Sequence, residues 1–198
     1  GSAYEGEAFT EDYHLPNDTA YAESCAAIGL ALFARRLLVA TGDSKYAEVM
    51  ERVLYNNGLS GIALSGDEFF YANLLEVNDT TYEFEHVKKV RQKWFDCSCC
   101  PTSYSRFLPQ LGKFCYSLSP ETAWIHIPAA AKLATEQYEI EVEGSYPCDG
   151  NIKIRIHRGG AFTLALRIPS WSRGYTVAVN GSADRSPLQH GYWMQKLE

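Results

Sequence analysis

The chain has 198 residues, of which 46% are hydrophobic and 21% are charged, a composition typical of a globular protein with one or two domains. Its net charge of −6, with no long basic run, argues against nucleic acids and anionic membranes as main partners. The longest helical apolar stretch, Ile28 to Ala40, is interrupted by two arginines and is too short to span a bilayer. No secretory signal pattern opens the sequence, and the compartment, cytoplasmic or exported, is left open.

Helical spacing of apolar residues dominates the first part of the chain. Capping residues predict a helix from about residue 20 to residue 40, and a second amphipathic repeat covers residues 46–54. Pro101 predicts the first turn of a third helix, which Pro109 should kink. The intervening residues 58–93 are expected to form loops and short strands.

After Pro120 the period of the apolar residues changes to two. The alternating segments are 139–143, 152–156, 162–168 and 175–179. Asn180 and Gly181 follow the last of these and predict a tight type I′ hairpin. We therefore expect an α+β chain in which a helical domain, residues 1–118, precedes an antiparallel β-sandwich, residues 119–198.

Three of the six cysteines crowd into the sequence Cys97-Ser98-Cys99-Cys100. Neighbouring cysteines seldom form a disulfide without strain, so this cluster indicates a metal site or a reactive thiol. Free backbone N–H groups at the start of the third helix are expected to favour the thiolate form. Two adjacent thiolates repel each other, and a soft divalent cation such as zinc removes this repulsion.

A zinc site needs about four ligands, and Cys99 and Cys100 supply two of them. Spacing does not choose the others among the remaining candidates, which are Cys97, Cys115, Cys148, the five histidines and the Glu23-Ser24-Cys25 segment. Glu23 and Cys25 would point to opposite faces of a regular helix. They can reach one ion only at the first turn of a helix or through the length of the glutamate side chain.

Several motifs that follow one another along the chain make it similar to a known family. They are Gly6-Glu7-Ala8-Phe9, Asp12-Tyr13-His14-Leu15-Pro16-Asn17, Ala20-Tyr21-Ala22-Glu23-Ser24-Cys25-Ala26, Phe69-Phe70-Tyr71-Ala72-Asn73, and Trp94-Phe95-Asp96-Cys97-Ser98-Cys99-Cys100-Pro101. In this series the chain resembles the bacterial β-L-arabinofuranosidases of glycoside hydrolase family 127. The resemblance implies the C-terminal part of an (α/α)6 toroidal catalytic domain, followed by the start of a β-sandwich.

The resemblance also implies a retaining glycosidase that acts on arabinofuranose-containing oligosaccharides or glycans and uses a cysteine as nucleophile. Cys99 corresponds to that nucleophile and Glu7 to the general acid/base. The residues that correspond to the zinc ligands are Glu23, Cys25, Cys99 and Cys100. Tyr71 corresponds to a tyrosine near the sugar.

A thiolate can replace the usual carboxylate nucleophile of a retaining glycosidase if it is ionised and accessible. The alternatives are a non-catalytic zinc or thiol module that binds carbohydrate or protein, and a thiol redox protein. Because helices of half a toroid leave apolar faces uncovered, we expect self-association or a partner chain. We also expect this segment on its own to have little or no turnover.

Overall fold

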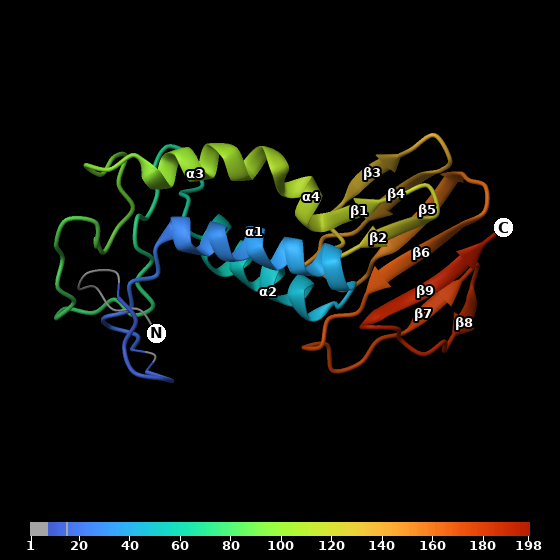
Figure 1. Ribbon diagram of the computed structural model, residues 1–198, viewed down its shortest axis with the longest axis horizontal. Helices are drawn as coiled ribbons and strands as arrows, with labels where there is room; N and C mark the ends of the chain where they lie inside the picture. Colours follow the sequence, from blue (N-terminus) through green and yellow to red (C-terminus); the bar gives the residue numbers. More distant parts are fainter. Residues whose placement is uncertain (1–7, 15) are drawn as a thin grey trace. The chain divides into compact units, whose positions relative to one another are not determined.

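The computed structural model describes residues 8–14 and 16–198, and it has two compact units (Figure 1). One contains the described residues up to Ala34 together with Val49–Pro109, and the other contains Arg35–Glu48 and Gln110–Glu198. In the described part of the chain every helix ends by Cys115 and every strand begins at Tyr116 or later. The expected α+β class is therefore confirmed.

The first two helices follow the predicted pattern, with shifted ends. Helix α1 spans Ser24–Thr41, and it begins four residues later than expected because Glu23 is extended and pairs with Ala72. Helix α2 spans Lys45–Val53 and continues as the π-helical turn η2, Leu54–Leu59. By length and apolar composition alone α1 could cross a membrane, contrary to the sequence expectation, but core helices and signal sequences pass the same test.

The third helix corrects one prediction and confirms another. Helix α3 spans Cys99–Phe107, so it begins two residues before Pro101 and includes both adjacent cysteines in its first turn. Proline is tolerated throughout the first turn, and its presence therefore could not fix the starting residue. The break at Pro109 is confirmed, because a 3₁₀ turn η3, Leu108–Gln110, separates α3 from α4, Leu111–Cys115.

Residues 60–98 form a long connection with little regular structure. Isolated pairings hold it together, namely Ile62 with Phe69, Phe69 with Gln92, and Phe84 with Val87. Buried apolar side chains anchor it to its unit, and these are Phe69, Tyr71, Ala72, Val87 and Phe95. This connection carries several of the residues that form the candidate site.

The second unit, Arg35–Glu48 with Gln110–Glu198, holds all the strands of the described chain and is called the β unit; it contains three sheets. The strands are β1 (Tyr116–Leu118), β2 (Thr122–Ile125), β3 (Ala131–Ala134), β4 (Glu139–Glu143), β5 (Lys153–Arg158), β6 (Phe162–Arg167), β7 (Val177–Val179), β8 (Ser182–Asp184) and β9 (Tyr192–Leu197). Their orders are β1-β2-β6-β9, β3-β4-β5 and β7-β8. All pairs are antiparallel except β2 with β6, which is parallel. Alternation along a strand shows which face is buried but not the direction of its partner.

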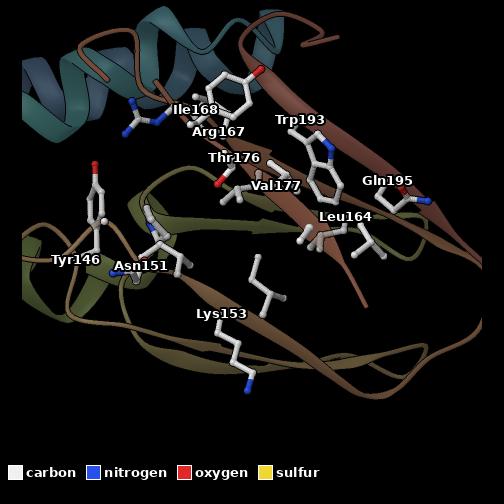
Figure 2. Close-up of a pocket in the computed structure, with 18 of the residues that line it drawn as sticks. Tyr146, Asn151, Lys153, Leu164, Arg167, Ile168, Thr176, Val177, Trp193 and Gln195 are labelled. Carbon is white, nitrogen blue, oxygen red and sulfur yellow. The ribbon is translucent and has the colours of Figure 1, made fainter. Parts of the chain in front are cut away.

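The hairpin between β7 and β8 is as predicted. Asn180 and Gly181 have φ values of 50° and 85°, which is the type I′ geometry. A groove of about 1140 Å³ lies in the same unit, with apolar residues such as Leu164, Val177 and Trp193 along it (Figure 2). Facing apolar sheet surfaces of this kind normally form the core of a sandwich. None of the described residues with a predicted catalytic or metal-binding role lines this groove.

Candidate metal centre

Four side chains converge at the start of α3. One ligand atom from each of Glu23, Cys25, Cys99 and Cys100 lies within 4.8 Å of the corresponding atoms of the other three. The Cys100 sulfur is 3.5 Å from the Cys25 sulfur and 3.8 Å from the Cys99 sulfur. The Glu23 carboxylate oxygen Oε1 is 3.5 Å from the Cys99 sulfur and 3.9 Å from the Cys100 sulfur.

These separations fit a tetrahedral zinc site. Zinc binds cysteine sulfur at about 2.3 Å and carboxylate oxygen at about 2.0–2.2 Å, so neighbouring ligand atoms of a tetrahedron lie roughly 3.5–3.8 Å apart. The four distances above lie in or close to that range, and the other two pairs of ligand atoms lie within 4.8 Å. Three sulfurs and one carboxylate are also a donor set that suits zinc. The residues present therefore fit the metal.

The local backbone explains how Glu23 and Cys25 reach the same point. Glu23 is extended and pairs with Ala72, whereas Cys25 is the second residue of α1. The Ser24 backbone N–H between them donates to the Tyr71 carbonyl at 2.9 Å. Because the chain changes from extended to helical between the two residues, the opposite-face rule of a regular helix does not apply. Glu23 and Cys25 thus meet at the first turn of a helix, one of the two arrangements that the sequence analysis allowed for a shared ion.

Ser24 itself is fully buried and joins a polar network beside the cluster. Its hydroxyl donates to the Phe70 carbonyl at 2.7 Å and accepts from the Asn73 amide at 3.1 Å and from the Tyr104 hydroxyl at 3.0 Å. Gly61 lies against this network, because a Cβ there would collide with the Tyr104 hydroxyl. The network therefore fixes the backbone that carries both Glu23 and Cys25.

The Cys99 thiol has a second polar neighbour besides the cluster. Its S–H donates to the Tyr71 hydroxyl at 2.9 Å, and that hydroxyl donates to the Cys97 sulfur at 3.6 Å. Burial raises the pKa of Tyr71, so the phenol keeps its proton and can act as a donor. Tyr71 is thus in direct contact with the predicted nucleophile.

The electrostatics of the metal-free cluster correct one expectation from the sequence. Burial raises the pKa of the Cys99 thiol to about 12 and that of Cys100 further still, so both are protonated at neutral pH without a cation. The backbone N–H at the start of α3 stabilises the thiolate of a different cysteine, because a hydrogen bond from the Cys99 backbone lowers the pKa of Cys97. Desolvation therefore outweighs the helix terminus at Cys99 and Cys100, and a bound cation would favour their ionised forms.

The other residues that the sequence analysis considered for the site lie outside the four-residue cluster. Glu7, the predicted acid/base, lies outside the described residues. Cys97 contacts the Tyr71 hydroxyl but is not part of the four-residue cluster, and Cys115 and Cys148 belong to the other unit. His86 was one of the five histidines considered as ligands; it is not part of the four-residue cluster, and its ring stacks on Tyr71. Only the fold brings these two rings together, since no motif or spacing links them.

Two domains of one protein family match most of this chain. The catalytic domain of β-L-arabinofuranosidase family GH127 matches residues 1–113, and the middle domain of the same family matches residues 122–197. The chain belongs to this family. The curated non-reducing end β-L-arabinofuranosidase of Bifidobacterium longum subsp. longum is 34% identical, over 97% of this chain and 31% of that protein.

Solved structures of the family are similar in fold. A GH127 β-L-arabinofuranosidase from Geobacillus stearothermophilus T6 is 40% identical with a TM-score of 0.87, over 100% of this chain and 33% of that one. A second GH127 β-arabinofuranosidase is 35% identical with a TM-score of 0.87, over the same shares of the two chains. The chain thus spans about a third of the length of these relatives.

Proposed function

We propose that this chain supplies the zinc centre and the cysteine nucleophile of a retaining glycosidase that cleaves β-L-arabinofuranosides. The observation that carries the proposal is the place of Cys99, whose sulfur is at once part of the four-residue cluster and in contact with the Tyr71 hydroxyl. A purely structural zinc site needs no such polar neighbour. The membership in the GH127 family supports the substrate class.

In this proposal zinc is held by Glu23, Cys25, Cys99 and Cys100 and would keep the sulfurs ionised at neutral pH. The Cys99 thiolate attacks the anomeric carbon, so that a carbon–sulfur bond forms as the glycosidic carbon–oxygen bond breaks. Glu7 gives its proton to the departing oxygen. Tyr71 can donate its hydroxyl proton in a hydrogen bond to the Cys99 sulfur.

In the second half of the reaction Glu7 takes a proton from water, and the water oxygen attacks the anomeric carbon. The carbon–sulfur bond breaks and Cys99 leaves as a thiolate. Two displacements at one carbon give net retention of configuration. The role of Glu7 rests on the family resemblance alone.

The deciding experiment replaces Cys99 by Ser. Because the segment spans about a third of its relatives, turnover is measured in a chain that also carries the remaining family domains, called here the full-length protein. With a synthetic β-L-arabinofuranoside we expect kcat to fall by about a thousandfold or more, since a neutral hydroxyl is a far weaker nucleophile than a thiolate. Cys148→Ser, at an exposed position of the other unit, is the matched control and should keep full activity.

Two outcomes would count against the proposal. If Cys99→Ser keeps turnover within about tenfold of the unchanged protein, Cys99 is not the nucleophile. If the unchanged full-length protein binds arabinofuranose-containing glycans but does not cleave them, the chain belongs to a non-catalytic zinc or carbohydrate-binding module.

Self-association or a partner chain remains a prediction. Large apolar side chains of α1 are exposed, among them Leu30, Phe33 and Val39. Exposed apolar surface on a helix is typical of a region that packs against another chain or domain. Light scattering of the 198-residue chain at micromolar concentration should therefore show a species larger than the monomer.

A further inference from the structure

We propose that His86 is a positioning residue, whose imidazole ring, stacked on Tyr71, holds the Tyr71 hydroxyl against the sulfur of Cys99. This inference rests on the proposed function, because positioning of Tyr71 matters for turnover only if Cys99 is the nucleophile. It concerns a residue outside the four-residue cluster and outside the motifs that the sequence singled out.

The first observation is the stack itself. The ring centroids of His86 and Tyr71 are 4.1 Å apart and the ring planes differ by 15°, so the rings lie face to face. Phe95 contacts the same phenol ring at 5.7 Å with the planes tilted by 60°. Two rings thus restrict the rotation of Tyr71 about its side-chain bonds, and this rotation sets the position of its hydroxyl.

The second observation is that the backbone fixes His86 independently of the metal cluster. Phe84 and Val87 exchange backbone hydrogen bonds of 3.1 and 2.8 Å across a tight turn that contains His86. Val87 is completely buried, and the His86 carbonyl accepts a hydrogen bond from the Ala72 N–H at 3.4 Å. The imidazole is therefore presented from a fixed turn that is also tied to the residue next to Tyr71.

The third observation is the reach of the Tyr71 hydroxyl. It lies 2.9 Å from the Cys99 sulfur and 3.6 Å from the Cys97 sulfur, so a small rotation of the ring would exchange one neighbour for the other. A displacement of about 1 Å in a positioned group can cost up to a hundredfold in rate. Loss of the stack would therefore weaken the contact with Cys99 without removing any group that touches the sugar.

The test compares His86→Ala, His86→Phe and Tyr71→Phe in the full-length protein, with the double variant H86A/Y71F. We expect His86→Ala to lower kcat about tenfold with KM within about twofold, and His86→Phe, which keeps the stack, to stay within about threefold of the unchanged protein. In the Tyr71→Phe background, His86→Ala should lower kcat by less than about twofold, because there is no hydroxyl left to position. His157→Ala, at an exposed position of the other unit, is the matched histidine control.

A second readout needs no turnover. Fluorotyrosine is placed at position 71 of the 198-residue chain and followed by fluorine NMR. The resonance should move and broaden in His86→Ala and stay close to its original position in His86→Phe, because a stacked ring both shields and restrains its neighbour. If His86 only supported the fold, the resonance would not distinguish His86→Ala from His86→Phe in this way.

The outcomes separate this inference from the proposed function. It is overturned if His86→Ala leaves kcat unchanged, if the loss is equally large in the Tyr71→Phe background, or if His86→Phe is as impaired as His86→Ala. If Cys99→Ser remains active, the proposed function fails and the positioning role fails with it, while the fluorine resonance still reports whether the stack exists.

Discussion

The two units of the molecule keep their residues in place by different means. In the unit that contains the four-residue cluster, the long connection of residues 60–98 has only isolated pairings, and buried polar groups around Ser24 fix the chain. In the β unit, continuous ladders do this work, such as the six paired positions between β6 and β9. The four-residue cluster thus lies where a few specific contacts set the geometry, whereas regular packing is found where many equivalent contacts set it.

This difference predicts different responses to substitution. A contact in the first unit should control metal binding more than overall stability. A contact in the second unit should control stability and leave metal binding unchanged. The expected effects below run from the largest to the smallest.

The largest effect is expected for Cys100→Ala. Cys100 is completely buried and its sulfur lies within 4 Å of those of Cys25 and Cys99, so its loss removes one of the four candidate ligand atoms of the cluster. We expect the affinity for zinc to fall by about a thousandfold or more. Metal analysis and competition with a coloured chelator measure this. Cys115→Ala, also buried but in the other unit, should still bind one equivalent, and a full equivalent in Cys100→Ala would disprove the ligand role.

The next effect is the dependence of zinc binding on pH. Because burial raises the pKa of Cys99 to about 12 and also raises that of Cys100, both thiols release a proton when the metal binds near neutral pH. Cys25 would also bind as a thiolate, so two or three protons are released, and the apparent affinity should rise by about a hundredfold to a thousandfold per pH unit between roughly pH 6 and 8. Chelator competition at a series of pH values gives the slope, and a slope near zero would show that no thiol ionises on binding.

The same pKa shifts should make the metal-free folded chain less stable as the pH rises, although a rising pH makes zinc binding near neutrality tighter. The unfolded thiols lose their protons near their ordinary pKa of 9.0, whereas the folded Cys99 thiol does so only near 12. The stabilising contribution is thus complete below pH 9 and is lost as the pH rises toward 12. Chemical unfolding of the metal-free chain across this window should show a falling free energy of unfolding.

A large effect on stability alone is expected for Ile140→Ala in the β unit. Ile140 is completely buried in β4, between partners on β3 and β5. Removing a buried isoleucine side chain to alanine typically costs about 2–5 kcal/mol. Denaturant unfolding measures the loss, and zinc binding of the folded protein should be unchanged. A variant that lost zinc while it remained folded would contradict the separation between the two units.

Ser24→Ala, in the unit that holds the cluster, should lower both the stability and the affinity for zinc. The change leaves buried partners of the hydroxyl without their hydrogen bonds, which costs about 1–3 kcal/mol. Since Ser24 lies between Glu23 and Cys25, we also expect zinc affinity to fall about tenfold, by analogy with the loss of other groups that orient metal ligands. Ser105→Ala, an exposed serine of α3, is the control. Equal zinc affinity in both variants would show that the network does not orient the ligands.

The same difference between the units explains what could be predicted from the sequence. Period-two patterns identified β4, β5 and β6, and two residues sufficed for the hairpin at Asn180, because these features depend on local spacing. The parallel pairing of β2 with β6 depends on residues some forty positions apart, and no local pattern encodes it.

The candidate site was less accessible to local reasoning. The pair of cysteines before Pro101 pointed to a metal, but the partnership with Glu23 and Cys25 came from the family resemblance. The residue numbers 23 and 99 are far apart, and an extended residue immediately before a helix overrides the helical spacing rule. The Ser24 network and the His86 stack were missed for the same reason, since each joins segments that only the folded chain brings together.

The smallest expected effect belongs to the feature that the sequence predicted best. Gly181 has a φ of 85°, and a Cβ there would meet no atom within 4 Å, so Gly181→Ala strains only the backbone of the β7–β8 hairpin. We expect a loss of about 1 kcal/mol in the free energy of unfolding, with zinc binding unchanged. Gly160→Ala, also in open space but without a positive φ, should change stability by less than about 0.5 kcal/mol. If both variants lost the same stability, the left-handed backbone at Gly181 would not be the cause.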